Sequence, residues 1–258
     1  MTIRRFAASA ATLAMLFSAN AALAQVSESG MGKVLPVEIY VCSFNDGQDA
    51  GDLDKAVEGW TEYMDDQDTN NYSAWTLTPF MFGAEQDFDF LWMGAYTDGN
   101  AMGAGIQSWL TEGGEQREAF DKVATCNAHV MLGSAMYKAP SDQQTPASGV
   151  ITMMDCKLNE GSRYSDIKGA ELKWSKYLTE NDSAAGYWHW FPTFGGGDAD
   201  FDYKVVSAYR DFNELGADFE HNANGGGRDT SREIFGDIDE CDDRRVYIAN
   251  SRRNAQLR

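Results

Sequence analysis

The sequence contains one module written twice, and this internal duplication is the feature that most limits how the chain can fold. Displacing the sequence by 113 residues aligns the stretch 75–96 with the stretch 188–209 without a gap. A repeat of this kind predicts two copies of one supersecondary unit that pack against each other. The identical positions in the two copies are Trp75, Pro79, Gly83, Asp87, Phe88, Asp89, Ala95 and Tyr96, which match Trp188, Pro192, Gly196, Asp200, Phe201, Asp202, Ala208 and Tyr209.

Each copy also carries one pair of cysteines, and the sequence has four in total. Cys42 aligns with Cys156 and Cys126 with Cys241 when the offset changes by one or two residues. Four cysteines can pair in three ways. The repeat selects Cys42–Cys126 and Cys156–Cys241, because each module then closes on itself. We therefore predict one structural disulfide in each module.

The first 24 residues have the features of an export signal. Arg4 and Arg5 form a basic start, residues 6–23 are rich in Ala, Leu, Met and Phe, and 22–24 give a small-x-small cleavage pattern before Gln25. We predict a cleaved signal peptide and a periplasmic or secreted protein, a compartment in which disulfides persist. No later segment is long and apolar enough to span a membrane, so we expect no membrane insertion.

The chain is strongly acidic, with 40 Asp and Glu against 21 Lys and Arg and a net charge of -19. Removal of the signal takes away two arginines and no acids, which changes the charge from -19 to -21. Such a surface repels phosphates, so we expect no nucleic-acid partner. Five arginines lie in the last fifteen residues. We predict a solvated basic tail at 251–258, with a docking segment for an acidic partner as the alternative.

The periodicity of each copy predicts the order β-α-β-β-α-β. The predicted helices begin at aspartate caps, Asp52 in the first copy and Asp166 in the second, and the central strands form a hairpin. Glycines interrupt the second helical region of both copies. Trp60 and Trp174 lie on the apolar helical stripes and are expected in the core. For the first copy the predicted elements are a strand at 37–41, a helix at 53–65, strands at 74–82 and 88–96, and a last strand at 128–137.

That order is typical of the ferredoxin-like sandwich, a four-stranded antiparallel sheet with both helices on one face. Its first and last strands are neighbours, which brings Cys42 beside Cys126 and agrees with the predicted pairing. The bare sheet faces are too apolar to meet water, so we predict an α+β fold in which the modules pack sheet to sheet as a fused α/β barrel. The modules span 36–138 and 150–250, residues 139–149 link them, and the protein is expected to be a monomer.

This organisation resembles the dimeric α/β-barrel superfamily, which includes NIPSNAP-like and antibiotic-biosynthesis-monooxygenase-like proteins, with the two halves fused in one chain. The resemblance covers about residues 36–250 and rests on element order and duplication, because no family motif matches residue by residue. It implies one of several activities, since members include cofactor-free oxygenases, isomerases, haem enzymes and proteins without a known activity.

Candidate ligand-binding residues come from the aromatic strip around His189 and from the ends of the central strands. On a strand, Trp188 and Trp190 point to one side and His189 to the other. Such a strip can stack a flat ligand held between the modules or can fill a core. The candidates are Trp75, Trp188, His189, Trp190, Tyr96, Tyr209 and Arg210.

The acidic hairpins are a second set of candidates: Asp87 and Asp89, and in the other copy Asp198, Asp200 and Asp202. The second set has a spacing similar to that of a calcium loop, but Tyr203 stands where such a loop needs glycine. We expect solvated hairpin ends whose aspartates accept backbone N–H bonds. The three histidines have no metal-ligand spacing. We expect no metal and no cofactor.

Three functions are compatible with these features. The first is an exported binding or accessory protein that holds a small apolar or aromatic ligand between its modules. The second is a cofactor-free monooxygenase- or isomerase-like enzyme, for which the available polar groups are His189, Tyr96, Tyr209 and Arg210. The third is a structural component of the envelope or extracellular space. A cavity above about 300 Å³ favours a binder or an enzyme over a structural role.

Overall fold

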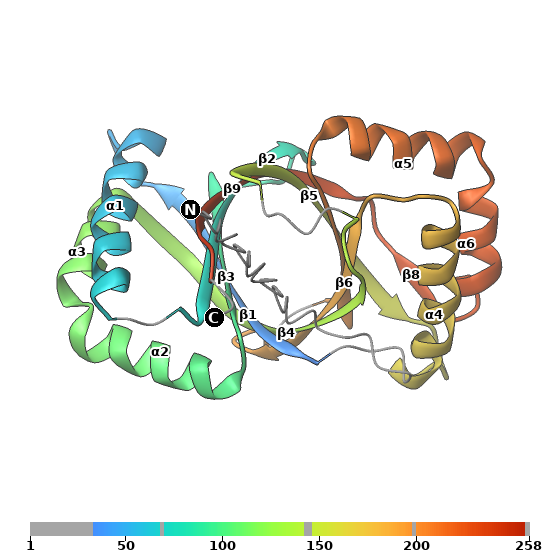
Figure 1. Ribbon diagram of the computed structural model, residues 1–258, viewed down its shortest axis with the longest axis horizontal. Helices are drawn as coiled ribbons and strands as arrows, with labels where there is room; N and C mark the ends of the chain where they lie inside the picture. The colour runs from blue at the N-terminus through green and yellow to red at the C-terminus, as the bar shows by residue number, and fades with distance from the viewer. Residues whose placement is uncertain (1–32, 68–69, 142–145, 198–199, 256–258) are drawn as a thin grey trace, which may run out of the picture.

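The computed structural model describes residues 33–67, 70–141, 146–197 and 200–255. The predicted signal peptide lies outside these residues. The strands of the two modules together form a central barrel, and the helices of each module lie on opposite sides of it (Figure 1). The elements of the first module are β1 (Leu35–Phe44), α1 (Ala50–Asp66), β2 (Tyr72–Met81), β3 (Phe90–Tyr96), α2 (Gly99–Glu112), α3 (Gly114–Val123) and β4 (Ala124–Lys138).

The second module repeats this order. Its elements are β5 (Ser148–Leu158), α4 (Tyr164–Glu180), β6 (Gly186–Phe194), β7 (Tyr203–Tyr209), α5 (Phe212–Asn224), α6 (Gly227–Phe235), β8 (Asp239–Cys241) and β9 (Arg245–Arg253). The glycines of the second helical region divide it into two helices in both copies, as predicted. The last strand differs between the copies, because β4 is continuous whereas its counterpart is divided into β8 and β9.

The strands form one closed antiparallel barrel. Within the first module the order is β4-β1-β3-β2, and β5 pairs with β9 and β7 in the second, as expected for ferredoxin-like sheets. The modules are joined at their edges, because β4 pairs with β6 and β2 pairs with β9. The predicted sheet-to-sheet packing is therefore accompanied by continuous hydrogen bonding around the barrel, so the edge strands β2, β4, β6 and β9 each gain a partner from the other module.

Side chains from all eight barrel strands pack together in the barrel interior. This inner cluster of buried residues consists of Val37, Ile39, Leu77, Leu91, Met93, Leu132, Ile151, Met153, Trp190, Val206, Tyr247 and Ala249. Successive residues of a strand point to opposite faces, so the alternate positions point outward to the helices. Each sheet therefore has two apolar faces, which explains why apolar residues occur at both parities of the strands.

Both long helices begin earlier than the sequence indicated. Asp49, and not Asp52, is the N-cap of α1, since its carboxylate accepts from the backbone N–H groups of Gly51 and Asp52. Asp52 lies three residues later and accepts from the Asp49 backbone, which completes a capping box. Asp166 holds the same position in α4, where it accepts from the backbone of Arg163. The predicted caps are thus the third residues of their helices.

The two disulfides pair as predicted, Cys42–Cys126 and Cys156–Cys241. In each case the two cysteines face each other across neighbouring strands, β1 and β4 in the first module and β5 and β8 in the second. Each bridge closes a loop of more than 80 residues. The pairing follows from the strand order, because the first strand of each module ends where the last one begins.

The last strand extends further toward the C-terminus than predicted and includes two of the C-terminal arginines, Arg252 and Arg253. Strand β9 continues to Arg253, three residues into the proposed tail, because it pairs with β2 of the other module as far as Ala74. Arg252 Nη1 lies 2.7 Å from Asp54 Oδ1 on α1. The tail is therefore shorter than 251–258. Arg252 and Arg253, which the prediction placed in the tail, pair with Asp54 and Asp65 of the first module. The predicted linker is shorter too, since β5 begins at Ser148. None of the described helices is long and apolar enough to cross a membrane.

Candidate functional site

A large cavity lies between the sheet and the helices of the first module, and not between the modules. It has a volume of about 1010 Å³ and is lined by outward-facing side chains of β1–β4 and by α1, α2 and α3. Its walls are mainly aromatic, with Trp60, Trp92, Trp109 and Phe120 among the lining residues. We name this space the helix–sheet cavity. The structure thus places the candidate ligand site on the opposite face of the first sheet from the one predicted.

A buried carboxylate, that of Glu38, lies in the wall of this cavity. Glu38 is a charged type of residue within the apolar strand β1, and it is only 4% exposed. Its Oε1 accepts hydrogen bonds from the Tyr72 hydroxyl at 2.6 Å and from the Tyr96 hydroxyl at 3.2 Å. His129 Nε2 lies 3.0 Å from Oε2. The carboxylate therefore contacts three side chains from three other strands, which satisfies the requirement that a buried polar group be hydrogen-bonded.

Strand register brings these groups together. Gly94 lies between Glu38 and Ala74 across the sheet, and a Cβ at that position would fall 2.0 Å from the Tyr72 hydroxyl oxygen. The glycine therefore leaves the space that Tyr72 needs to cross the neighbouring strand and reach Glu38. Trp92 Nε1 donates to the same hydroxyl at 2.9 Å. A chain of hydrogen bonds thus runs from Trp92 through Tyr72 to the carboxylate.

The tyrosines of this network are donors at physiological pH. Burial, followed by the nearby Glu38 charge, raises the pKa of Tyr40, Tyr72 and Tyr96 above the ordinary value. Their hydroxyl groups therefore keep their protons, so the groups in this network that can accept a proton are Glu38 and His129.

His129 connects the buried carboxylate to the surface. Its side chain is 44% exposed and lies flat on the ring of Tyr40, with the centroids 3.7 Å apart. The two residues face each other directly in the pairing of β1 with β4. Arg117 also lines the cavity, but its guanidinium donates to the carbonyl oxygens of Trp109 and Leu110 near the end of α2.

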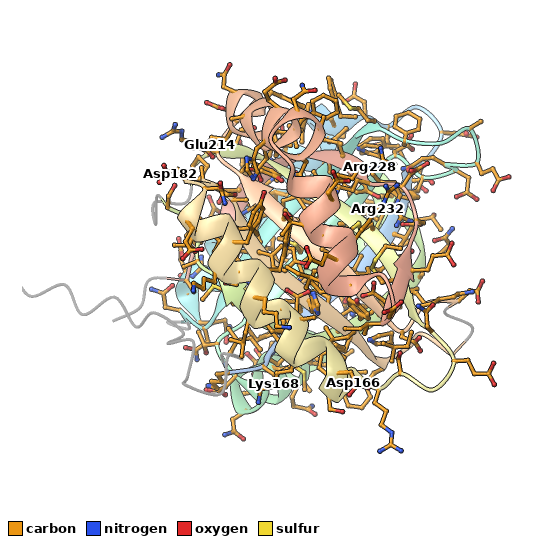
Figure 2. The ribbon with its side chains drawn as sticks, turned by 90° about the vertical axis from the view of Figure 1, so that its right-hand side faces the viewer. Asp166, Lys168, Asp182, Glu214, Arg228 and Arg232 are labelled. Carbon is orange, nitrogen blue, oxygen red and sulfur yellow. A yellow bond between two sulfur atoms is a disulfide. The ribbon has the colours of Figure 1, made fainter. Side chains whose placement is uncertain are left out.

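The second module contains a comparable pair that is completely buried. His189 Nε2 lies 2.6 Å from Glu171 Oε1, and both side chains are 0% exposed. The Tyr187 hydroxyl donates to the same carboxylate oxygen. Figure 2 shows α4 and α6 side by side over this region, with Asp166 and Asp182 near the two ends of α4. The pair therefore lies in the core, beneath the helices.

This buried pair leads to a stability prediction. His189→Leu leaves Tyr187 as the remaining partner of a carboxylate that has no access to water. Breaking a buried pair in this way costs about 3–5 kcal/mol. We expect that loss in urea unfolding. The double variant Glu171→Leu with His189→Leu is expected to recover most of it, since neither polar group remains. A single variant as stable as the unaltered protein would show that the contact between the two side chains does not stabilise the fold.

The structure separates the predicted ligand-binding residues into several environments. Tyr96 lines the helix–sheet cavity. Trp190 belongs to the inner barrel cluster, and Trp75 and Trp188 pack against it, whereas His189 points the other way, as the strand alternation predicted. Tyr209 is buried in a small cluster near α5, and Arg210 is a surface residue that pairs with Glu214. They therefore do not form one site.

The acidic hairpins have a structural role that is the same in both copies. Asp89 accepts from the backbone N–H of Phe44 at 2.7 Å, and Asp202 accepts from Leu158 at 2.7 Å. Asp87 is exposed, Asp200 forms an ion pair with Lys157, and Asp198 lies outside the described residues. Within the described part of the chain, no group of three or more His, Cys, Asp or Glu side chains could hold a metal ion.

Sequence reasoning missed Glu38, Tyr72, His129 and Glu171 as members of polar networks. A usable signal was present for the two glutamates. Glu38 interrupts the apolar strand, and Glu171 lies on the buried stripe of its helix next to Ala170. An acidic residue in such a position is rarely buried without a partner. The histidines gave no comparable signal, because their partners are distant in sequence.

Comparison with known proteins gives matches of structure only. No protein-family model matches the chain, and no curated protein matches it. A proposed monooxygenase from Fusobacterium nucleatum has a TM-score of 0.54 at 10% identity, covering 85% of this chain and 93% of that chain. A haem-binding protein from Thermus thermophilus has a TM-score of 0.50 at 11% identity, covering 86% and 92%. A proposed chlorite dismutase has a TM-score of 0.52 at 10% identity, covering 85% and 95%.

These matches confirm the predicted fold. The chain has the same architecture as these proteins, a closed antiparallel barrel built from two ferredoxin-like halves in tandem. Sequence identities near 10% show the fold alone, so any activity must be argued from the site.

Proposed function

We propose that this protein binds a small aromatic or apolar molecule in the helix–sheet cavity, and that it does so as an exported binding or accessory protein. The observation that carries the proposal is an aromatic-walled cavity of about 1010 Å³ with a buried, hydrogen-bonded carboxylate in its wall. Ligand sites are typically apolar cavities of about 300–1,000 Å³ with few convergent polar groups. The two disulfides are consistent with export, as is the predicted signal peptide.

Haem is one occupant that the structural relatives bring into consideration, and the residues of the cavity do not fit it. Haem needs an axial ligand and cations for its propionates. His129 is the histidine that lines the cavity, but its Nε2 is bonded to Glu38 and its ring is stacked on Tyr40. The guanidinium of Arg117 is held by helix carbonyl groups. Carboxylates outnumber cations among the described lining residues, which opposes a dianionic ligand.

The proposal predicts that filling the cavity removes the ligand. Ala104 on α2 lines the cavity and is itself exposed, so Ala104→Trp puts an indole at the mouth of the ligand space. A steric cost of about 1–3 kcal/mol corresponds to a loss of roughly 5- to 140-fold in affinity. We expect native mass spectrometry of the purified protein to detect a bound small molecule, and we expect Ala104→Trp to carry much less of it.

The duplication supplies a matched control. Ala217 occupies the position on α5 that Ala104 occupies on α2, and it is exposed like Ala104 but does not line the cavity. Ala217→Trp should therefore leave the bound molecule unchanged. Equal loss in both variants would indicate general destabilisation, and no loss in either would place the ligand elsewhere.

A cofactor-free enzyme is the second candidate, and the Glu38–His129 pair is the observation that favours it. A carboxylate and an imidazole in contact at the wall of an apolar cavity can remove a proton from a bound substrate. Incubating the purified protein with its co-purified molecule in air distinguishes the two functions. A binding protein returns the molecule unchanged, whereas an enzyme converts it and His129→Gln slows the conversion.

A further inference from the structure

The charges around the helix–sheet cavity are unbalanced. The carboxylates of Glu38, Glu112 and Asp121 line it, whereas Arg117 is the lining arginine and no described lysine lines it. The guanidinium of Arg117 is directed to the carbonyl oxygens of Trp109 and Leu110. Carboxylates therefore outnumber cationic side chains among the described lining residues, with Glu38 buried and Glu112 and Asp121 exposed at the cavity edge.

Glu38 has room for one more donor. A carboxylate offers about four acceptor positions, and Tyr72, Tyr96 and His129 account for three of them. Tyr72 and Tyr96 are neutral donors, so neither of them offsets a negative charge on Glu38. A cation brought to the fourth position would interact with that charge more strongly than it would in water.

The aromatic walls favour the same kind of ligand. The faces of aromatic rings attract cations, and tryptophan does so most strongly. Trp60, Trp92 and Trp109 all line the cavity, together with Tyr40 and Phe120. Aromatic rings around a buried carboxylate are a suitable environment for an organic ammonium group attached to an apolar body.

From this arrangement we infer that the ligand of the helix–sheet cavity is an aromatic or apolar amine whose protonated nitrogen pairs with Glu38. This inference rests on the proposed function, because it concerns the same cavity. It adds the chemical class of the ligand: a cation is preferred over a neutral molecule of the same shape, and an anion of that shape is excluded.

Three probes with one carbon skeleton test the inference. They are 1-naphthylmethylamine, 1-naphthalenemethanol and 1-naphthoic acid, titrated separately into the full mature chain by isothermal calorimetry. Measurements at about pH 8 keep an alkyl amine protonated. We expect the amine to bind at least about tenfold more tightly than the alcohol, since a buried charge pair is worth that much or more. We expect no binding of the carboxylate.

Two variants identify the group responsible. Glu38→Gln keeps the size of the side chain and one acceptor oxygen but removes the charge, so the amine should lose its advantage and bind like the alcohol. Glu171→Gln alters an equally buried glutamate that does not line the cavity, and the order of the three affinities should be unchanged. The alcohol reports whether Glu38→Gln still folds with an intact cavity.

Each outcome has a distinct meaning. Tightest binding of the amine, lost in Glu38→Gln and kept in Glu171→Gln, supports the inference. Equal affinities for all three probes, with loss of binding in Ala104→Trp, would overturn the amine preference and leave the proposed function standing. Tightest binding of the carboxylate would also overturn the preference. If none of the probes binds, the proposed function and the inference both fail.

Discussion

Reduction of both disulfides is expected to unfold the protein. Each bridge closes a loop of more than 80 residues, and the chain-entropy estimate for such a loop is about 4–5 kcal/mol. Together the two contribute roughly 9 kcal/mol, which is most of the roughly 5–15 kcal/mol that typically separates folded from unfolded domains. Circular dichroism and urea unfolding, with and without reductant, measure the effect.

The modules also allow the two bridges to be separated. The pair of substitutions Cys42→Ser and Cys126→Ser should lower the melting temperature by roughly 10–18 °C, as should Cys156→Ser with Cys241→Ser. Mild reductant should open the first bridge before the second, because Cys126 is exposed whereas its counterpart Cys241 is half-buried, and the other cysteine of each bridge is buried. A fully reduced protein with an unchanged melting temperature would show that the barrel does not depend on the bridges.

The first module alone, as the fragment 25–143, is expected to dimerise or aggregate. In the whole chain β4 pairs with β6 and β2 pairs with β9, so the fragment loses the partners of both edge strands. It also exposes its half of the inner barrel cluster. Unpaired edges and apolar patches of several hundred Å² both promote association.

Light scattering after size-exclusion chromatography provides the measurement, with the full mature chain as the control. We expect the full chain to be a monomer that unfolds in one transition, because the barrel is shared by both modules. A soluble, monomeric and stably folded fragment would contradict the role of the edge pairings. A full chain that unfolds in two separate steps would contradict the shared core.

The fold could be predicted because its signals are local and were present twice. The apolar alternation in the strands, the glycine breaks in the helical regions and the paired cysteines all recur in both copies. The disulfides followed from topology, since Cys42 ends one strand and Cys126 begins its neighbour. The helix starts were misplaced by three residues because Asp49 and Asp52 are both good capping residues, and sequence alone did not show that they cap jointly.

The site could not be predicted in the same way, because it depends on which side chains the folded chain brings together between the sheet and the helices. The duplicated aromatic strip pointed to the space between the modules, but Trp190 belongs to the buried inner cluster. The groups that surround Glu38 come from strands far apart in sequence, and the repeat does not reproduce the glutamate. Threonine, at position 152, occupies the position that corresponds to Glu38. The polar group of the cavity therefore lies at a position where the two copies differ, and not at one that they share.

The edge pairings of the barrel have a consequence for how this protein can evolve. The sheet under the helix–sheet cavity is held at both of its edges by β6 and β9 of the second module, and neither strand lines the cavity. Mutations in the helices over that cavity can then alter selectivity while the other half maintains the sheet. Fusion of two copies thus assigns ligand recognition to one half of the molecule and stability of the sheet to the other. New ligand specificities can then arise without loss of the fold.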